Sequence, residues 1–198
     1  AQVEIEVAAG DIGRAQSAAD ELEIVANRFE SKALVASAAL ARGRVRLAEG
    51  DAAGAEQSLS EALGLWNEVG APYEAALTRL CLAEAHAAQG MLFLQQGDSA
   101  RGEASLARAL ALNPNLADAL HWQAGMHNDA GRLRDHLAVR QRLAEIDPLN
   151  VANLLNLNFA LRDSGKRTEA EAVATRLLRA FPDNPQGYGA RALDLLDA

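Results

Sequence analysis

The feature that most constrains the fold of this chain is a fixed 34-residue spacing of proline and glycine in its C-terminal half. Two sets of residues keep this interval: Pro114, Pro148 and Pro182, and Gly97, Gly131 and Gly165. Glycine ends a helix in a left-handed conformation, whereas proline cannot continue a helix but suits the start of the next one. The repeated unit therefore predicts a helix, a glycine turn, a second helix and a proline turn.

Apolar residues recur at helical spacing between these glycines and prolines. We expect two stripes to face the core: Leu154, Leu157 and Leu161, and Ala100, Ala104, Ala107, Leu110 and Ala111. Thr168 with Glu171 predicts a capping box, and Asn184 before Pro185 predicts a helix start. The composition agrees with closely packed helices, since aromatic residues make up only 4% of the chain.

A 34-residue unit of two helices that closes in proline resembles the tetratricopeptide repeat. The family's large and small positions hold His86, Gln89, Gly90, Phe93, Gly102 and Leu106 in the unit 83–116, and Leu154, Leu157, Asn158, Leu161, Ala170 and Ala174 in the unit 151–184. The unit 117–150 matches less well, because His127, His136 and Arg140 stand where large apolar or small residues are usual. The resemblance implies an all-α fold: a right-handed α–α superhelix of antiparallel helical hairpins, with about eleven helices.

The N-terminal half repeats with a longer interval, since Gly10, Gly50 and Gly90 stand 40 residues apart. Residues 41–50 and 68–76 resemble the helical-repeat sensor regions of LuxR-type bacterial transcriptional regulators. We expect longer repeats over 1–90, three 34-residue units over 83–184 and a capping helix over 185–198. The two periods collide at Gly90 and Gly97, so one helix over 73–96 must serve both. Either an insertion into a natural repeat or an engineered joining of two repeat fragments explains it.

Composition and motifs argue against several functions. A net charge of −8 disfavours a nucleic-acid surface, and no apolar stretch is long enough to cross a membrane. The single cysteine, Cys81, cannot form an intrachain disulfide and is expected to be a buried thiol, which favours a reducing, cytoplasmic compartment. No phosphate-binding loop or serine nucleophile elbow occurs. His121 and His127 are six residues apart, the wrong spacing for a helical metal pair. We therefore expect no enzyme, no cofactor and no metal.

Two runs of arginine and two tryptophans have more than one interpretation. The arginines are Arg42, Arg44 and Arg46 in one run, and Arg132, Arg134, Arg140 and Arg142 in the other. We expect solvated helix faces paired with acids, and the alternative is contact with an acidic partner. Trp66 and Trp122 are expected to pack in the core, although Trp66 near a helix end could anchor a partner.

In the resembling family, the first helix of each unit lines a concave groove that binds partner peptides or helices. Carried over by position, this implies groove residues Met91, Leu94, Gln95, His121, Asn128, Asp129, Leu155, Phe159, Arg162 and Asp163. The lysine, asparagine and arginine clamp of one branch is absent, since Ala87, Met91, Trp122 and Ala152 stand at such places. We therefore predict a scaffold that binds a protein or peptide and possesses surfaces for homo-oligomer formation. The alternatives are an effector-sensing segment of a bacterial regulator and an engineered building block without a native ligand.

Overall fold

The computed structural model describes the backbone of residues 1–196 and the side chains of residues 1–192, and this part of the chain contains helices and no strand. The helices are α1 (Gln2–Ala8), α2 (Ile12–Phe29), α3 (Lys32–Ala48), α4 (Ala52–Val69), α5 (Pro72–Gln95), α6 (Ser99–Leu112), α7 (Ala117–Asp129), α8 (Leu133–Ile146), α9 (Val151–Asp163), α10 (Arg167–Ala180) and α11 (Pro185–Leu196). The predicted all-α fold of about eleven helices is confirmed. Residues 197 and 198 of the expected capping helix lie outside the described residues.

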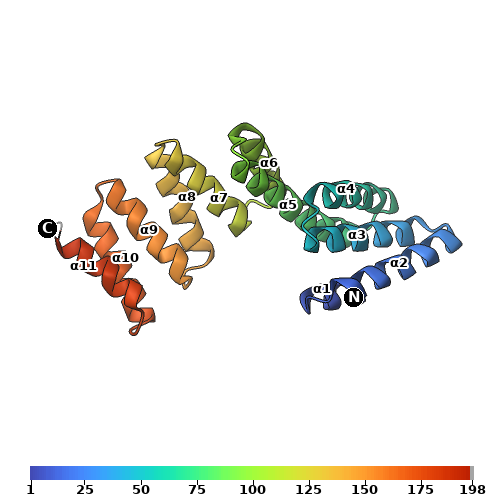
Figure 1. Cartoon of the computed structure of the whole chain (residues 1–198), viewed down its shortest axis with the longest axis horizontal. Helices are drawn as coiled ribbons and strands as arrows, with labels where there is room; N and C mark the ends of the chain where they lie inside the picture. The colour runs from blue at the N-terminus through green and yellow to red at the C-terminus, as the bar shows by residue number, and fades with distance from the viewer. Residues whose placement is uncertain (197–198) are drawn as a thin grey trace. The chain divides into compact units, whose positions relative to one another are not determined.

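The chain divides into two compact units, unit 1 over Ala1–Leu116 and unit 2 over Ala117–Ala198. Unit 1 contains α1 to α6, and consecutive helices pack side by side in it, as Figure 1 shows for α3 and α4. Its core is rich in alanine, with Ala36, Ala39, Ala62 and Ala75 around Trp66. Small side chains let the helix axes approach closely, so the unit is held by many short contacts between helices.

Two glycines inside helices of unit 1 lie where neighbouring helices approach closely. A Cβ atom on Gly43 would lie 2.5 Å from Cγ of Leu59, and one on Gly90 would lie 2.8 Å from Cγ of Leu106. Gly90 is buried in the middle of α5, so the prediction of one helix over 73–96 is confirmed. The missing side chain makes room for α6 and leaves the helix unbroken. One helix, Pro72–Gln95, consequently occupies the region where the two repeat lengths meet.

The prediction that the alanine stripe of α6 faces the core is wrong, because a different face of the helix is buried. Gly102, Ser105, Leu106 and Ala109 are the buried residues, whereas Ala100, Ala104, Ala107 and Ala111 are exposed. Alanine is compatible with either face of a helix, because exposing one methyl group costs little. The large side chain of Leu106 decides which face turns inward.

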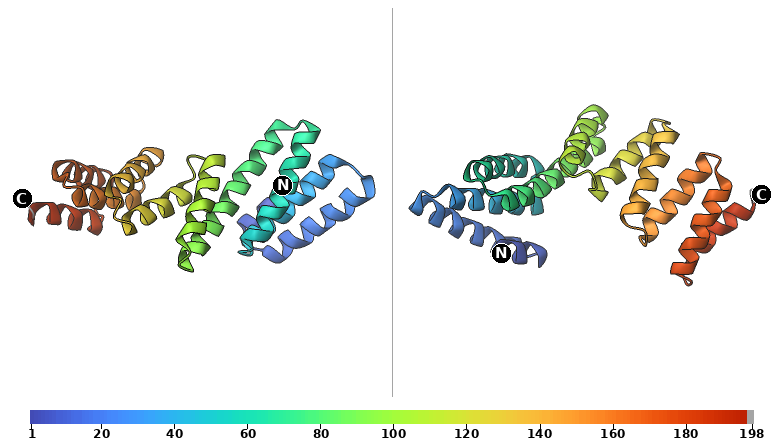
Figure 2. Two further views of the ribbon diagram at one scale, coloured as in Figure 1. Left: turned by 90° about the horizontal axis from the view of Figure 1, so that it is seen from above. Right: turned by 180° about the vertical axis from the view of Figure 1, so that it is seen from behind.

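Unit 2 contains α7 to α11, and α9, α10 and α11 pack against one another in both views of Figure 2. Its core is built mainly from leucine: Leu137, Leu154, Leu157, Leu161 and Leu177. The predicted inward stripe of α9 is thus confirmed. Leucine at every third or fourth position gives α9 one continuous apolar face, which α8, α10 and α11 cover.

The turns follow the glycine and asparagine signals but not the predicted capping box. Gly97, Gly131 and Gly165 have φ of 80°, 67° and 71°, the left-handed conformation expected at the turns. The Asn184 side chain accepts a hydrogen bond from the Gly187 N–H at 3.0 Å and so begins α11 as predicted. The capping box of Thr168 and Glu171 does not form, because α10 already begins at Arg167 and no side chain caps it.

Candidate binding surfaces

The residues predicted to face a partner on α5 have different surroundings. Met91 and Leu94 are half-buried, and Gln95 is exposed. A Cβ atom on Gly102 would lie 2.6 Å from Cδ2 of Leu94, so the Leu94 side chain packs against α6. Within unit 1, Gln95 is therefore the most accessible of the three predicted residues.

On α7, His121, Asn128 and Asp129 are all exposed, and His121 has a distinctive partner. Its Nδ1 atom lies 3.1 Å from Nη1 of Arg140 on α8. Because a guanidinium only donates hydrogen bonds, Nδ1 must accept, and the ring proton of the neutral imidazole must be on Nε2. Burial lowers the pKa of His121, Arg140 lowers it further, and Asp118 opposes them. The geometry and the pKa shift both favour a neutral imidazole.

Arg140 itself is a buried cation that contacts no carboxylate among the residues whose side chains the structure describes. The residue is 7% exposed, and its Nε atom has no hydrogen-bond partner in the described part of the chain. Burial lowers the pKa of the Arg140 guanidinium. His136, one turn earlier, is also buried, and its Nδ1 lies 2.7 Å from the carbonyl oxygen of Ala124, to which it donates as the N–H. The residues that departed from the repeat pattern in 117–150 thus include two buried polar side chains.

The α9 residues surround an apolar hollow of about 440 Å³ at α11, the α9–α11 hollow. Its lining is Leu155, Phe159, Gln186, Gly189, Ala190 and Ala192. Phe159 is 46% exposed, which is high for an aromatic ring beside other apolar groups. Arg162 is half-buried and Asp163 is exposed near the C-terminal end of α9. Two of the four residues predicted on α9 therefore meet at one apolar site.

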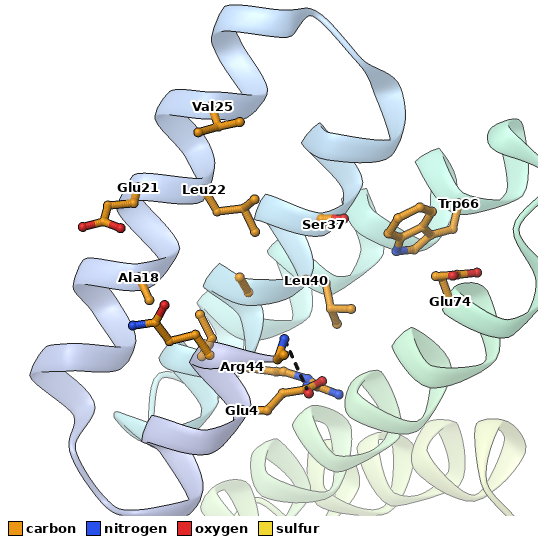
Figure 3. Close-up of a pocket in the computed structure, with 14 residues that line it drawn as sticks. Glu4, Ala18, Glu21, Leu22, Val25, Ser37, Leu40, Arg44, Trp66 and Glu74 are labelled. Carbon is orange, nitrogen blue, oxygen red and sulfur yellow. Dashed lines mark hydrogen bonds and ion pairs between the residues drawn. The ribbon is translucent and has the colours of Figure 1, made fainter.

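A second hollow of about 510 Å³ lies in unit 1 between α1, α2, α3, α4 and α5, the unit 1 hollow (Figure 3). Leu22 and Val25 on α2 and Leu40 on α3 supply its apolar lining, and Glu4 and Arg44 form an ion pair at one end. Trp66 also lines the hollow. The Trp66 ring is buried as predicted, but its Nε1–H has no hydrogen-bond partner among the described residues. Sequence reasoning did not find this hollow, because its lining comes from five separate helices.

The arginines of α3 include the predicted pairs with acids, but they are half-buried and link helices, so the prediction of a solvated face is wrong for this run. Arg42 pairs with Glu23 and also with Glu61, at 3.1 Å. Arg46 donates to the carbonyl oxygen of Gly54 at 3.0 Å and to the Ser58 hydroxyl at 2.9 Å. Half-buried guanidinium groups thus connect α3 to its neighbours and leave little positive charge for a partner.

Arg44, the remaining arginine of the α3 run, contacts the single cysteine. Arg44 Nε lies 3.4 Å from Sγ of Cys81. Cys81 is 6% exposed, as expected for a buried thiol.

The described residues contain no group of three or more histidine, cysteine or acidic side chains that could hold a metal ion. Across the same residues, the search for a long apolar helix that could cross a membrane finds none.

Comparisons with known proteins agree with this geometry. Residues 87–151 match the family described as tetratricopeptide repeat, and a comparison with curated proteins gives no match. Among solved structures, the chain resembles PilF of Pseudomonas aeruginosa, with a TM-score of 0.54 and 19% identity over 84% of this chain and 70% of PilF. It also resembles MamA of AMB-1, with a TM-score of 0.52 and 17% identity over 72% of this chain and 81% of MamA. At these identities the likeness concerns the fold alone.

Proposed function

We propose that this chain, of which residues 87–151 match the tetratricopeptide-repeat family, is a scaffold without catalytic activity that binds a segment of a partner protein on unit 2. The observation that carries the proposal is the α9–α11 hollow, where Phe159 remains 46% exposed. Burying an aromatic ring removes apolar surface from water and stabilises a complex. Arg162 and Asp163, three and four residues after Phe159 on α9, supply polar groups near this apolar site. An apolar pocket with a few polar neighbours is how peptide segments are commonly bound.

A random peptide display library tests this function directly. We expect the wild-type chain to enrich peptides that carry a bulky apolar side chain, and Phe159→Ala to weaken their binding by roughly tenfold or more, as for an interface anchor. Tyr188→Ala is the matched control, since Tyr188 on α11 is 57% exposed and does not line the hollow. A library that gives no enriched peptide on the wild-type chain contradicts the proposal.

The same hollow is also the surface that a second copy of the chain would cover, so homo-oligomer formation stays a prediction. Light scattering over a range of concentrations tests it. A mass that rises with concentration, and that Phe159→Ala keeps at the monomer value, supports self-association through this site.

The unit 1 hollow favours a second function, the binding of a small effector. Trp66 offers an unpartnered Nε1–H donor beside apolar side chains, which suits a ligand with an acceptor atom and an apolar body. A thermal-shift screen of small molecules should then contain a compound that raises the unfolding temperature of the wild-type chain. Trp66→Phe should reduce that shift, because it removes the donor and keeps most of the ring. An equal shift in both proteins would place the compound elsewhere.

The resemblance of the N-terminal half to LuxR-type sensor regions stays a prediction, as does the engineered origin of the overlap between the repeat lengths. A single natural gene that spans residues 83–97 without interruption would eliminate the engineered origin.

A further inference from the structure

We propose that Arg140 and His121 form a binding site for one carboxylate side chain of the partner segment. This inference rests on the proposed function and specifies the chemistry of the partner. It comes from the one arginine of α8 that the fold buries, not from a surface cluster of positive charge.

The argument starts from the cost of burying a guanidinium. A buried arginine is normally compensated by an acid, because the desolvated charge is otherwise strongly unfavourable. Arg140 is 7% exposed, and its contact within the described residues is to the neutral Nδ1 atom of His121 at 3.1 Å. Its Nε–H is also buried without an acceptor in that part of the chain. The positive charge at this point therefore lacks its counter-charge, which a ligand can supply.

His121 makes this charge available at the surface. The imidazole accepts from Arg140 through Nδ1, so its Nε2 carries the proton, and the residue is exposed. A hydrogen-bond chain polarises each member, so the cation behind the ring strengthens Nε2–H as a donor. A carboxylate that accepts from Nε2 would complete a chain from guanidinium to imidazole to anion.

The surroundings favour one carboxylate over a polyanion. Asp118, one turn before His121 on the same helix, carries negative charge beside the site, and the whole chain has a net charge of −8. Phosphate or nucleic acid would bring several charges near Asp118, whereas a glutamate or aspartate side chain brings one. The charge at Arg140 thus indicates an acidic residue within a mostly uncharged peptide.

The α9–α11 hollow sets where the rest of this peptide binds. In the described part of unit 2, no Cα atoms of α7 and α9 lie within 8 Å of each other, while α9 and α11 do approach to that distance. Packed helices lie about 8–10 Å apart, so His121 and the hollow are separated by more than one such spacing. An extended peptide advances about 3.3 Å per residue. We therefore expect the acid and the apolar anchor about four to six residues apart.

The test is a selection of random peptides of about twelve residues on the full chain and on two variants. Arg140→Met removes the buried charge and keeps a side chain of similar volume, and Arg134→Met removes an exposed arginine of the same helix. We expect the wild type and Arg134→Met to enrich one acidic residue at a fixed distance from the apolar anchor, and Arg140→Met to lose the acid but keep the anchor. Replacing a buried unpaired charge by an apolar side chain is often neutral or stabilising, so this variant should fold.

A second variant keeps the inference testable if Arg140→Met fails to fold. His121→Ala lies at an exposed position and leaves the core intact. For a selected peptide and its glutamine counterpart, anisotropy should give a preference for the acid of about tenfold or more on the wild-type chain, and almost none on His121→Ala. Enriched peptides without an acidic residue, or an acid preference unchanged in the variants, would overturn this inference and leave the proposed function standing. No enriched peptide at all contradicts the function itself.

Discussion

The two units use the same glycine turns but begin their second helices in different ways. In unit 1 the turns read Gly-Asp, and the carboxylates of Asp11, Asp51 and Asp98 accept hydrogen bonds at 2.9–3.0 Å from the first turns of α2, α4 and α6. In unit 2 they read Gly-Arg132 and Gly-Lys166, and neither side chain caps its helix. The comparison teaches that the positive φ of glycine is common to both units, whereas the cap is optional. Unit 1 is specified more strongly by its local sequence.

The units also treat buried charge differently. The half-buried arginines of α3 in unit 1 pair with acids or donate to neighbouring helices, as Arg42 does with Glu23 and Glu61. Among the described residues, Arg140 in unit 2 contacts a neutral imidazole and no acid. Paired charges fix helices to one another, while a buried charge without a partner acid is unfavourable. Four predictions test the differences between the two units.

The largest effect is expected from removing a fully buried leucine in each unit. Leu59→Ala in unit 1 and Leu154→Ala in unit 2 should each cost about 2–5 kcal/mol of unfolding free energy, because each leaves a cavity. Stability in repeat proteins is carried by neighbouring elements. Hydrogen exchange should therefore show the larger loss of protection within the substituted unit. Equal loss in both units would break the division of the chain at residue 116.

The next largest effect tests the close packing of helices in unit 1. Gly90→Ala places a Cβ 2.8 Å from Leu106 and 3.3 Å from the Gly102 carbonyl oxygen, so it should destabilise the chain by about 1–3 kcal/mol. Gly64→Ala is the control, because nothing lies within 4 Å of its Cβ position on α4. That variant should stabilise the chain by about 0.5–1 kcal/mol through helix propensity. Chemical unfolding measures both, and a stabilising Gly90→Ala would contradict the close approach of α5 and α6.

Exchanging caps between the units should have a smaller effect. Asp51→Ala removes the acceptor of the Gly54 N–H and should cost about 1 kcal/mol. Lys166→Asp supplies a cap that α10 lacks and should gain about 0.5–1 kcal/mol. The exposed pair of Lys166 and Glu169 that it removes contributes little. Thermal unfolding of both variants tests whether capping separates the units, and no gain from Lys166→Asp would count against it.

The smallest effect is a pH dependence from the buried imidazole of unit 1. Burial lowers the pKa of His86 and outweighs the opposing effect of Glu56, whose carboxylate lies 3.9 Å from Nδ1, and Arg108 lowers the pKa slightly further. The folded state therefore binds this proton less readily than the unfolded state. The stabilising contribution is complete above the ordinary pKa of 6.5 and is lost as the pH falls through the lower folded value.

An NMR titration of the imidazole checks the direction of this shift, and unfolding curves at several pH values check its effect on stability. His86→Gln should flatten the dependence below pH 6.5. In unit 2, Arg140→Met should raise the pKa of His121, since it removes a neighbouring cation. An unchanged pKa in that variant would contradict the contact between the two side chains.

Much of the helical framework could be predicted from the sequence. Gly131 and Gly165 mark turns, Asn184 begins α11, and the leucines of α9 face the core. These features depend on backbone conformation and on contacts within a few residues, which the sequence states directly. The alanine stripe of α6 failed because alanine does not distinguish the two faces of a helix.

The candidate sites could be predicted only in part. Positions carried over from the repeat family included Leu155 and Phe159, which the fold brings together with α11. The same transfer also selected Leu94, whose side chain packs on α6 because Gly102 leaves room for it. The departure of Arg140 from the repeat pattern was visible in the sequence. Its burial without an acid was not, because burial depends on the neighbouring helices.

The sequence by itself determined the repeat length, the turns and the helical character of this protein, because glycine, proline and apolar spacing act on the backbone near them. Only the tertiary structure decided which distant side chains meet. His121 and Arg140 are 19 residues apart, and the lining of the unit 1 hollow comes from five helices. Such pairs depend on how far helices approach and rotate against one another, and the volume of every side chain between them contributes to that.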